Sequence, residues 1–285
     1  MKTVSNLKKD LEFNGGLASL IEVLKTIAVS QYRILERRLK SYDDFLRTIE
    51  NFFRFFDINT LEHPFLRPQK NTQIVVAVTS DSGLLGGLNV QVVGNAIREL
   101  EKIPGRLVVI GERGKIYARE AAVPYTAFSG IKEEERHAQA MQVRDYLIKE
   151  IAEERFGYLK VIFPYPVSFT IQRVETLQFL PFLPTNKAGG VKGTFSFSDI
   201  IFESDPSLIA EYLVYLWMGQ KLFEIFGLSR LAEFAARYVH LEESAQKLKE
   251  LDKKTRLEYF RVRHELIDRN MRELFSARLL YAQEH

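Results

Sequence analysis

Apolar residues near the amino terminus recur at alternating steps of four and three, and only Asn14 and Lys25 are polar in the series. This spacing is a heptad seam and predicts one long helix. A helix of roughly fifty residues rises about 75 Å, so it must pack against an element of similar length. The seam consists of Leu7, Leu11, Asn14, Ala18, Ile21, Lys25, Ala28, Tyr32, Leu35, Leu39, Tyr42, Leu46, Ile49, Phe53 and Phe56. Its weakest point, where a bend or break would occur, is Gly15-Gly16.

The period changes after the turn residues around Pro64 and Pro68. A β-branched run over residues 73–79 predicts a buried strand. Helices and strands then alternate, which predicts a parallel α/β sheet. We expect helices at 87–102, 115–121 and 132–155, and strands at 106–110 and 159–163. Two later extended segments, 167–179 and 195–202, are expected to form a hairpin on the sheet edge.

From Asp205-Pro206 onward the chain has no further proline and only Gly219 and Gly227 as weak helix formers, so a second long helix follows. Phe234, Leu241, Leu248, Phe260 and Ile267 are its expected seam partners. The predicted fold is α/β, with long N- and C-terminal helices forming an antiparallel coiled coil and a central Rossmann-like α/β domain. We expect boundaries at 1–62, 63–203 and 204–285.

Composition excludes several classes of function. The chain has 0 Cys, which excludes disulfides, thiolate nucleophiles and zinc-thiolate sites. No run approaches the eighteen or so apolar residues that a membrane span needs. A net charge of +3 requires local segregation of basic residues for any nucleic-acid role. Basic residues do cluster on the two end helices, but solvated helix faces explain at least half of that pattern, and aromatic stacking platforms between the charges are lacking.

Candidate chemistry is sparse. The glycine-rich segment after the first strand opens a helix, where phosphate binds in many folds. It lacks the Lys-Ser/Thr end of a phosphate loop, so a tight turn for close helix and sheet packing is the favoured interpretation. The 5 His residues are scattered and no serine elbow occurs. Carboxylates such as Glu133-Glu-Glu135 cluster, but without an apolar site that would raise a pKa for acid-base catalysis. We therefore expect no catalytic residue, no metal and no cofactor.

Three stretches carry a resemblance to one family. The first is the turn Thr79-Ser-Asp-Ser-Gly-Leu-Leu-Gly-Gly-Leu-Asn89, and the second runs from Asp205-Pro206 to Glu233-Phe-Ala-Ala-Arg237. The third is the end of the final helix, with Tyr259, Arg263, Ile267, Glu273 and Ser276. They resemble the gamma subunit of F-type rotary ATP synthases. The family's motif turn maps onto Thr79, Ser80, Asp81, Gly83, Gly86, Gly87 and Asn89.

The resemblance implies a central-stalk rotor subunit that is not itself an enzyme and couples ion flow to ATP synthesis or hydrolysis. The implied partners are the alpha and beta subunits of the hexamer, the epsilon subunit and the membrane rotor ring, without nucleic acid or direct membrane insertion. The implied location is peripheral, on the cytoplasmic face of a bacterial inner membrane. Residues implied in the shaft and its hexamer contact are Lys25, Ala28, Ser30, Arg33, Glu233, Arg237, Arg263, Ile267 and Glu273.

The sequence also departs from the family pattern. Glu22-Val-Leu replaces the usual lysine-alanine-methionine, Leu85 replaces a small residue, and residues 278–285 extend past the usual end. These departures suggest a divergent or alternative rotary ATPase. Two other classes stay open from the residues alone: a coiled-coil tether with a small α/β ligand-binding domain, and an enzyme that uses residues 80–89 for a phosphorylated ligand.

Overall fold

A computed structural model of the chain describes residues 3–39, 43–52, 63–68, 70–154, 156–182 and 204–283. The expected strand at 195–202 and the seam residues Tyr42, Phe53 and Phe56 lie outside these ranges. The contacts divide the chain into two units. The helical unit comprises residues 1–27 and 238–285, and the α/β unit comprises residues 28–237.

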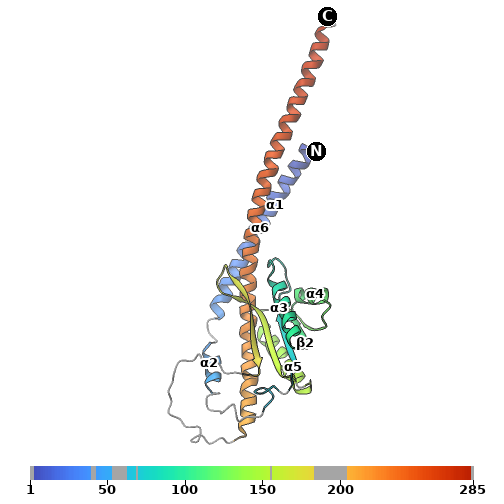
Figure 1. Cartoon of the computed structure of the whole chain (residues 1–285). Coiled ribbons are helices and arrows are strands. Elements are labelled where there is room, and N and C mark those ends of the chain that lie inside the picture. Colours follow the sequence, from blue (N-terminus) through green and yellow to red (C-terminus); the bar gives the residue numbers. More distant parts are fainter. Residues whose placement is uncertain are drawn as a thin grey trace. The chain divides into compact units, whose positions relative to one another are not determined.

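The elements follow the order that the pattern predicts, except that one strand is added and two helices stand in place of the single amino-terminal helix (Figure 1). The helices are α1 (Val4–Leu39), α2 (Asp43–Phe52), α3 (Leu88–Lys102), α4 (Glu112–Glu120), α5 (Arg136–Glu154) and α6 (Pro206–Gln283). The strands are β1 (Gln73–Val78), β2 (Gly105–Ile110), β3 (Tyr125–Phe128), β4 (Tyr158–Pro166) and β5 (Gln172–Leu180). The two long end helices with an α/β region between them are confirmed. The sequence analysis missed β3.

The five strands form one mixed sheet in the order β3-β2-β1-β4-β5. β1 pairs in parallel with β2 and β4, and β2 pairs in parallel with β3. β5 pairs antiparallel with β4 at the sheet edge. Strand β1 lies at the centre and every one of its residues is buried. Burial on both faces explains why its sequence is a continuous β-branched run instead of an alternating one.

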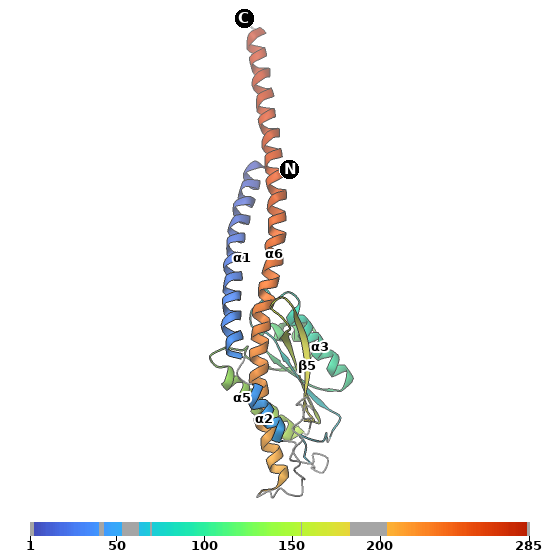
Figure 2. The same ribbon diagram turned by 90° about the vertical axis from the view of Figure 1, so that its left-hand side faces the viewer.

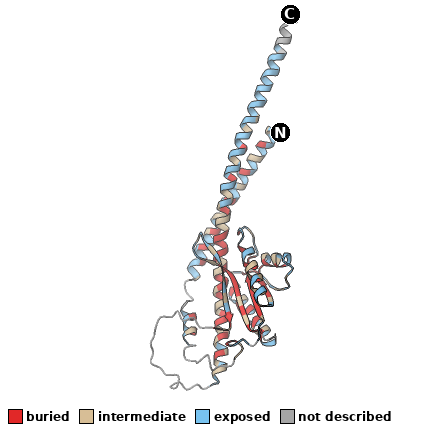
Figure 3. Cartoon of the chain, in the orientation of Figure 1, coloured by how far each residue is buried: buried red, intermediate tan, exposed pale blue. Residues whose placement is uncertain are grey.

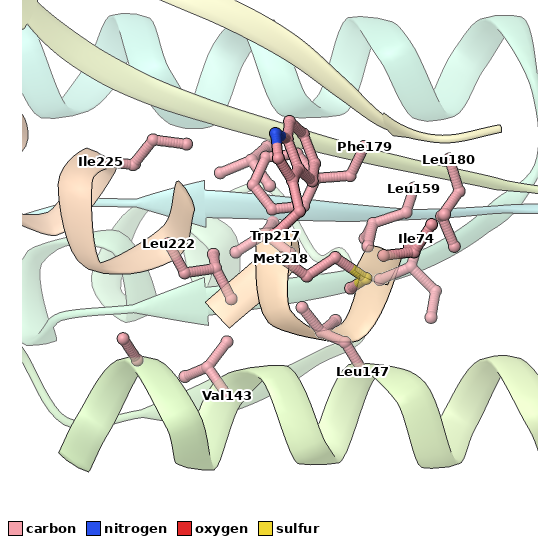
Figure 4. Close-up of a cluster of buried hydrophobic side chains, with 14 of the residues drawn as sticks. Ile74, Val143, Leu147, Leu159, Phe179, Leu180, Trp217, Met218, Leu222 and Ile225 are labelled. Carbon is pink, nitrogen blue, oxygen red and sulfur yellow. The ribbon is translucent and has the colours of Figure 1, made fainter. Parts of the chain in front are cut away.

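The core of the α/β unit lies on both faces of this sheet. Ile74, Val76 and Val78 of β1 face a large cluster built from α5, α6 and α2. Val75 and Ala77 face a smaller cluster with α3 and α4 on the opposite side. Figure 4 shows the larger cluster, with Met218 and Leu222 of α6 next to Leu147 and Val143 of α5. The portion of α6 in this unit is therefore a core helix of the domain.

Trp217 anchors one end of the larger cluster. Its ring makes edge contacts with Phe179 at 5.1 Å and with Phe182 at 4.9 Å. Its indole N–H donates to Glu50 Oε1 of α2 at 3.3 Å. Because Trp217 is the single tryptophan of the chain, its fluorescence reports on the packing of α6 against the sheet.

Helices α1 and α6 pack along the predicted seam within each unit (Figure 2). In the helical unit, Ile21 is buried in one cluster with Leu241 and Leu248. In the α/β unit, the clustered seam residues are Tyr32, Leu35, Leu231, Phe234 and Ala235. α1 continues through Gly15-Gly16 as one helix. The antiparallel pairing of the end helices is thus confirmed.

One part of the expected seam register is wrong. Phe260 and Ile267 of α6 are 46% and 45% exposed, so they are not seam partners of α1. Figure 3 shows that exposure predominates along the described carboxy-terminal part of α6, whereas the centre of the sheet is buried. In the described ranges no helix is long and apolar enough to cross a membrane.

Candidate functional site

The turn between β1 and α3 is closed by its own polar side chains. The side-chain oxygen of buried Asn89 accepts the Ser80 N–H at 3.2 Å, and its side-chain nitrogen donates to Ser80 Oγ at 2.8 Å. The Ser80 hydroxyl donates to the Ser82 carbonyl at 2.7 Å. Gly86 has a φ of 58°, a left-handed conformation that costs glycine little. These contacts give the motif turn one defined shape.

The same turn caps the amino end of α4. Asp81 Oδ1 accepts the Glu112 N–H at 2.9 Å, and Thr79 Oγ1 accepts the Gly114 N–H at 3.0 Å. The Ser80 carbonyl accepts the Arg113 N–H at 3.0 Å. Free amides at a helix amino end are what an anionic ligand would bind. Here these three amides bind the turn itself.

On its other side the turn contacts α6 through three residues that we call the clamp: Ser82, Glu233 and Arg237. Ser82 Oγ donates to Glu233 Oε1 at 3.1 Å and accepts from Arg237 Nη2 at 2.5 Å. Arg237 Nη2 also donates to Glu233 Oε1 at 2.6 Å. Arg230 Nη1 donates to the second oxygen, Oε2, at 2.6 Å. Glu233 is only 4% exposed, whereas Ser82 lies at the surface, so the clamp is a charge-assisted link between the motif turn and a buried carboxylate of α6.

Apolar contacts reinforce the clamp. Leu85 and Leu88, on either side of Gly86-Gly87, form a buried cluster with Ala236 of α6. Alanine at position 236 allows this close approach because its side chain is a single methyl group. The motif turn therefore packs on α6 by both polar and apolar groups.

The space where a nucleotide would bind is filled. In open α/β sheets ligands bind at the carboxyl ends of the strands where the strand order reverses, which here is between β1 and β4. The cavity at this place is lined by Thr79, Ser80, Asn89, Ser229 and Glu233, among others, and measures about 10 Å³. That is about the room one water needs, far below the 300–1,000 Å³ of ligand pockets. α6 occupies the crevice, so the motif turn serves packing.

The sequence analysis placed Glu233 and Arg237 correctly on one helix but did not name Ser82 or Arg230. A signal for Arg230 was present, because Arg230, Glu233 and Arg237 are spaced three and four residues apart and so share a helix face. Ser82 stands at the variable position of the motif, and only the fold brings it to α6. Among the described residues no group of three or more His, Cys, Asp or Glu could hold a metal ion.

Lys25, one of the two polar seam positions, bridges the two helices of the helical unit. Its Nζ lies 2.9 Å from Glu22 Oε1 and 2.6 Å from Glu242 Oε2. The hydrogen bonds that Lys25 donates to Glu242 and Glu22 raise the pKa of Lys25 above its ordinary value. The hydrogen bond from Lys25 lowers the pKa of the Glu242 carboxyl. The seam thus contains a charged cross-link between α1 and α6.

The remaining predicted contact residues divide by exposure. Ala28 is fully buried in the seam. Ser30 and Arg33 are exposed, and Arg33 lines a groove of about 610 Å³ beside the tip of the β4 and β5 hairpin. Arg263, Ile267 and Glu273 are exposed on α6. None of them belongs to the cluster around the motif turn, so the predicted residues fall into an internal group and a surface group.

A family model described as "ATP synthase" matches residues 5–278. The ATP synthase gamma chain of Mycoplasmopsis synoviae is 23% identical, over 97% of this chain and 98% of its own. That of Rubrobacter xylanophilus is 22% identical, over 96% and 97%. That of Symbiobacterium thermophilum is 26% identical, over 75% of each chain. The matches extend over nearly the whole chain at low identity.

Solved structures share the fold. A chain of the Euglena gracilis mitochondrial ATP synthase, in a structure of OSCP, F1 and c-ring, has a TM-score of 0.70 at 16% identity, covering 96% of this chain and 93% of its own. A chain of the Tetrahymena thermophila central stalk and c-ring has a TM-score of 0.59 at 16% identity, covering 79% of this chain and 99% of its own.

The fold and the clamp define a class of protein in which an α/β domain is fixed to one of two paired long helices and its crevice is filled by that helix. The cavity left in this crevice, about 10 Å³, has no room for a nucleotide. The chain belongs to the ATP synthase gamma chain family. It is a central-stalk subunit of an F-type ATP synthase and a non-catalytic one.

Proposed function

We propose that the paired ends of α1 and α6 turn inside a hexamer of alternating alpha and beta subunits, and that the turning changes the nucleotide affinity of each beta subunit in sequence. A shaft that contacts three beta subunits differently biases each toward a distinct state, which is coupling by differential contact. The α/β domain binds the epsilon subunit and the membrane rotor ring. The complex is peripheral, on the cytoplasmic face of a bacterial inner membrane.

The observation that carries this proposal is the clamp. Rotation applied to the α/β domain must reach α6 without slip, and the clamp joins the motif turn to that helix through the hydrogen bonds of Ser82 with buried Glu233 and with Arg237. A ligand-binding domain on a tether would need neither a filled crevice nor such a link to its helix. The clamp therefore favours the shaft over the tether.

Exposed side chains support a hexamer contact on α6. Beyond Thr255 the helix exposes large apolar residues at alternating steps of three and four, interrupted at His264. An exposed apolar row of this kind favours a partner surface. Its members are Leu257, Phe260, Ile267, Met271 and Leu274, which are 45–67% exposed. We propose that Arg263, Ile267 and Glu273 of α6, with Ser30 and Arg33 of α1, contact the hexamer.

This assignment divides the chain into a shaft helix at 1–62, an α/β domain at 63–203 and a second shaft helix at 204–285. Lys25, Ala28, Glu233 and Arg237 then act within the shaft, where Lys25 joins the two helices and Glu233 joins helix and domain. Residues 278–283 of the tail belong to the second shaft helix.

The test is co-expression of the chain with the alpha and beta subunits of its own source, followed by size-exclusion chromatography and an ATPase assay. We expect a stable complex whose ATPase activity requires this chain. Ile267→Asp should weaken the complex without changing the stability of the isolated chain, because the side chain is exposed. Leu208→Asp is the matched control, since Leu208 is 61% exposed on the same helix and outside the proposed contact. A chain that elutes alone and leaves ATPase activity unchanged would contradict the proposal.

A further inference from the structure

Helix α6 contains one short pattern twice: an aromatic residue followed by a glycine one turn later. The first copy is Tyr215 and Gly219, and the second is Phe223 and Gly227. In each copy the aromatic ring and the glycine lie next to each other on one side of the helix. We call each such pair of an aromatic residue and a glycine a notch. Glycine inside a helix costs about 1 kcal/mol relative to alanine, so two of them in a buried helix core need a reason.

Each notch holds an arginine of α5. The Arg144 guanidinium carbon lies 3.7 Å from the Tyr215 ring centroid, and that of Arg136 lies 4.3 Å from the Phe223 ring centroid. Both arginines are buried, at 7% and 4% exposure. The guanidinium plane stacks on the aromatic face, a contact that lysine reproduces poorly.

The glycines make room for these guanidinium groups. A Cβ at Gly219 would lie 2.9 Å from Arg144 Nη1, and a Cβ at Gly227 would lie 2.7 Å from Arg136 Nη1. Both distances are shorter than van der Waals contact. The nearest atoms to the added Cβ groups are Met141 Cε, 2.8 Å from the one at position 219, and Leu39 Cδ2 at position 227. Alanine at either position would therefore displace an arginine together with Met141 or Leu39.

Carboxylates on the α5 side pair with both arginines. Arg144 Nη2 lies 2.8 Å from Asp145 Oδ1, and Arg136 Nη1 lies 3.3 Å from Glu133 Oε1. On α6 the Tyr215 hydroxyl accepts a hydrogen bond from Arg144 Nη2 and donates to Asp145 Oδ1 at 3.3 Å. Arg144 therefore contacts α6 both by stacking and by a hydrogen bond.

We propose that Arg136 and Arg144 are positioning residues that hold α5, and with it the sheet, at one axial register on α6. The arginines are eight residues apart on α5, as are the glycines on antiparallel α6, so both notches fill only in one register. Two contacts about 12 Å apart along the helix resist sliding and pivoting, which one contact does not. The inference rests on the proposed function, because a fixed register matters for a domain that transmits rotation.

A double-mutant cycle on the full chain tests the contact. Gly219→Ala should lower the thermal midpoint, followed by Trp217 fluorescence. In the Arg144→Met background the same change should lower the midpoint less, because the clash with the guanidinium is gone and only the clash with Met141 remains. Gly94→Ala in α3 is the matched control, since nothing lies within 4 Å of its added Cβ, and it should raise the midpoint in both backgrounds.

The functional readout is ion transport per ATP hydrolysed by the complete ATP synthase in vesicles. With Gly219→Ala and Gly227→Ala together, assembled complexes should keep hydrolysing ATP and transport fewer ions per ATP. A merely structural role would reduce the amount of complex and leave the ratio unchanged. An unchanged ratio, or the same midpoint shift for Gly219→Ala in both backgrounds, would overturn the proposal. If the unaltered chain supports no ATPase activity, the proposed rotor function is wrong. The double-mutant cycle in thermal unfolding would still test the contact between Arg144 and Gly219.

Discussion

Removing the charge of Glu233 should destabilise the α/β unit strongly. Its two carboxylate oxygens accept from Arg230 and Arg237 at 2.6 Å each and from Ser82 at 3.1 Å. Glu233→Gln leaves one acceptor oxygen and turns an amide N–H toward the second guanidinium. Breaking a buried pair costs about 3–5 kcal/mol. The arginine side chains are still 23% and 15% exposed, which places the expected loss at the low end, about 3 kcal/mol.

Urea unfolding of the full chain, followed by Trp217 fluorescence, measures this loss. Ser82→Ala removes a single hydrogen bond and should cost about 1 kcal/mol. Because both residues belong to the clamp, the double variant should lose less than the sum of the two. Glu273→Gln is the control on an exposed part of the same helix and should stay within about 0.5 kcal/mol of the original chain. A Glu233→Gln variant as stable as that control would refute the reasoning.

Three further predictions concern local effects. Gly15→Ala should stabilise the chain by about 1 kcal/mol in thermal unfolding, because nothing lies within 4 Å of the added Cβ, and destabilisation would contradict this. Asp81→Ala should cost about 1 kcal/mol in urea unfolding by removing the cap on the Glu112 amide, and an unchanged midpoint would argue against that cap. The hydrogen bonds from Lys102 and Lys160 lower the pKa of Glu99, so its stabilising effect is present above the ordinary value of 4.5 and is lost as pH falls below it. Glu99→Gln should therefore reduce the loss of unfolding free energy as pH falls below 4.5. An unchanged pH dependence would count against the ion pairs of Glu99 with Lys102 and Lys160.

Much of the fold could be predicted because its signals are local. The continuous β-branched run of β1 reflects burial on both faces of the central strand, and the seam from Leu7 to Leu35 reflects the packing of α1 on α6. The motif turn was found by resemblance, and the structure explains its composition. Asp81 and Asn89 cap and close it, while Gly86 takes a left-handed conformation.

Other features could not be predicted because they depend on contacts between distant segments. β3 has four residues at the sheet edge and no fully buried position, so its pattern is weak. The antiparallel direction of β5 follows from the short hairpin after β4, where Val167 and Ile171 pair. Periodicity alone also left the seam register undetermined, and Phe260 and Ile267 were assigned to it wrongly.

The glycines of α6 show the same limit. From the sequence, Gly219 and Gly227 are only weak helix formers. Their role is visible once α5 places Arg144 and Arg136 against them. A local preference for alanine is outweighed here by a tertiary contact, since the guanidinium groups need the space that a side chain would fill.

Single-molecule rotation tests the central claim most directly. The chain has 0 Cys, so Glu101→Cys, at an exposed position near the end of α3, provides one attachment point on the α/β domain. The hexamer is fixed to a surface, a bead is coupled to this cysteine, and ATP is added. We predict that the bead turns in one direction for as long as ATP is hydrolysed. A bead that stays fixed while the hexamer hydrolyses ATP at its full rate would contradict the account.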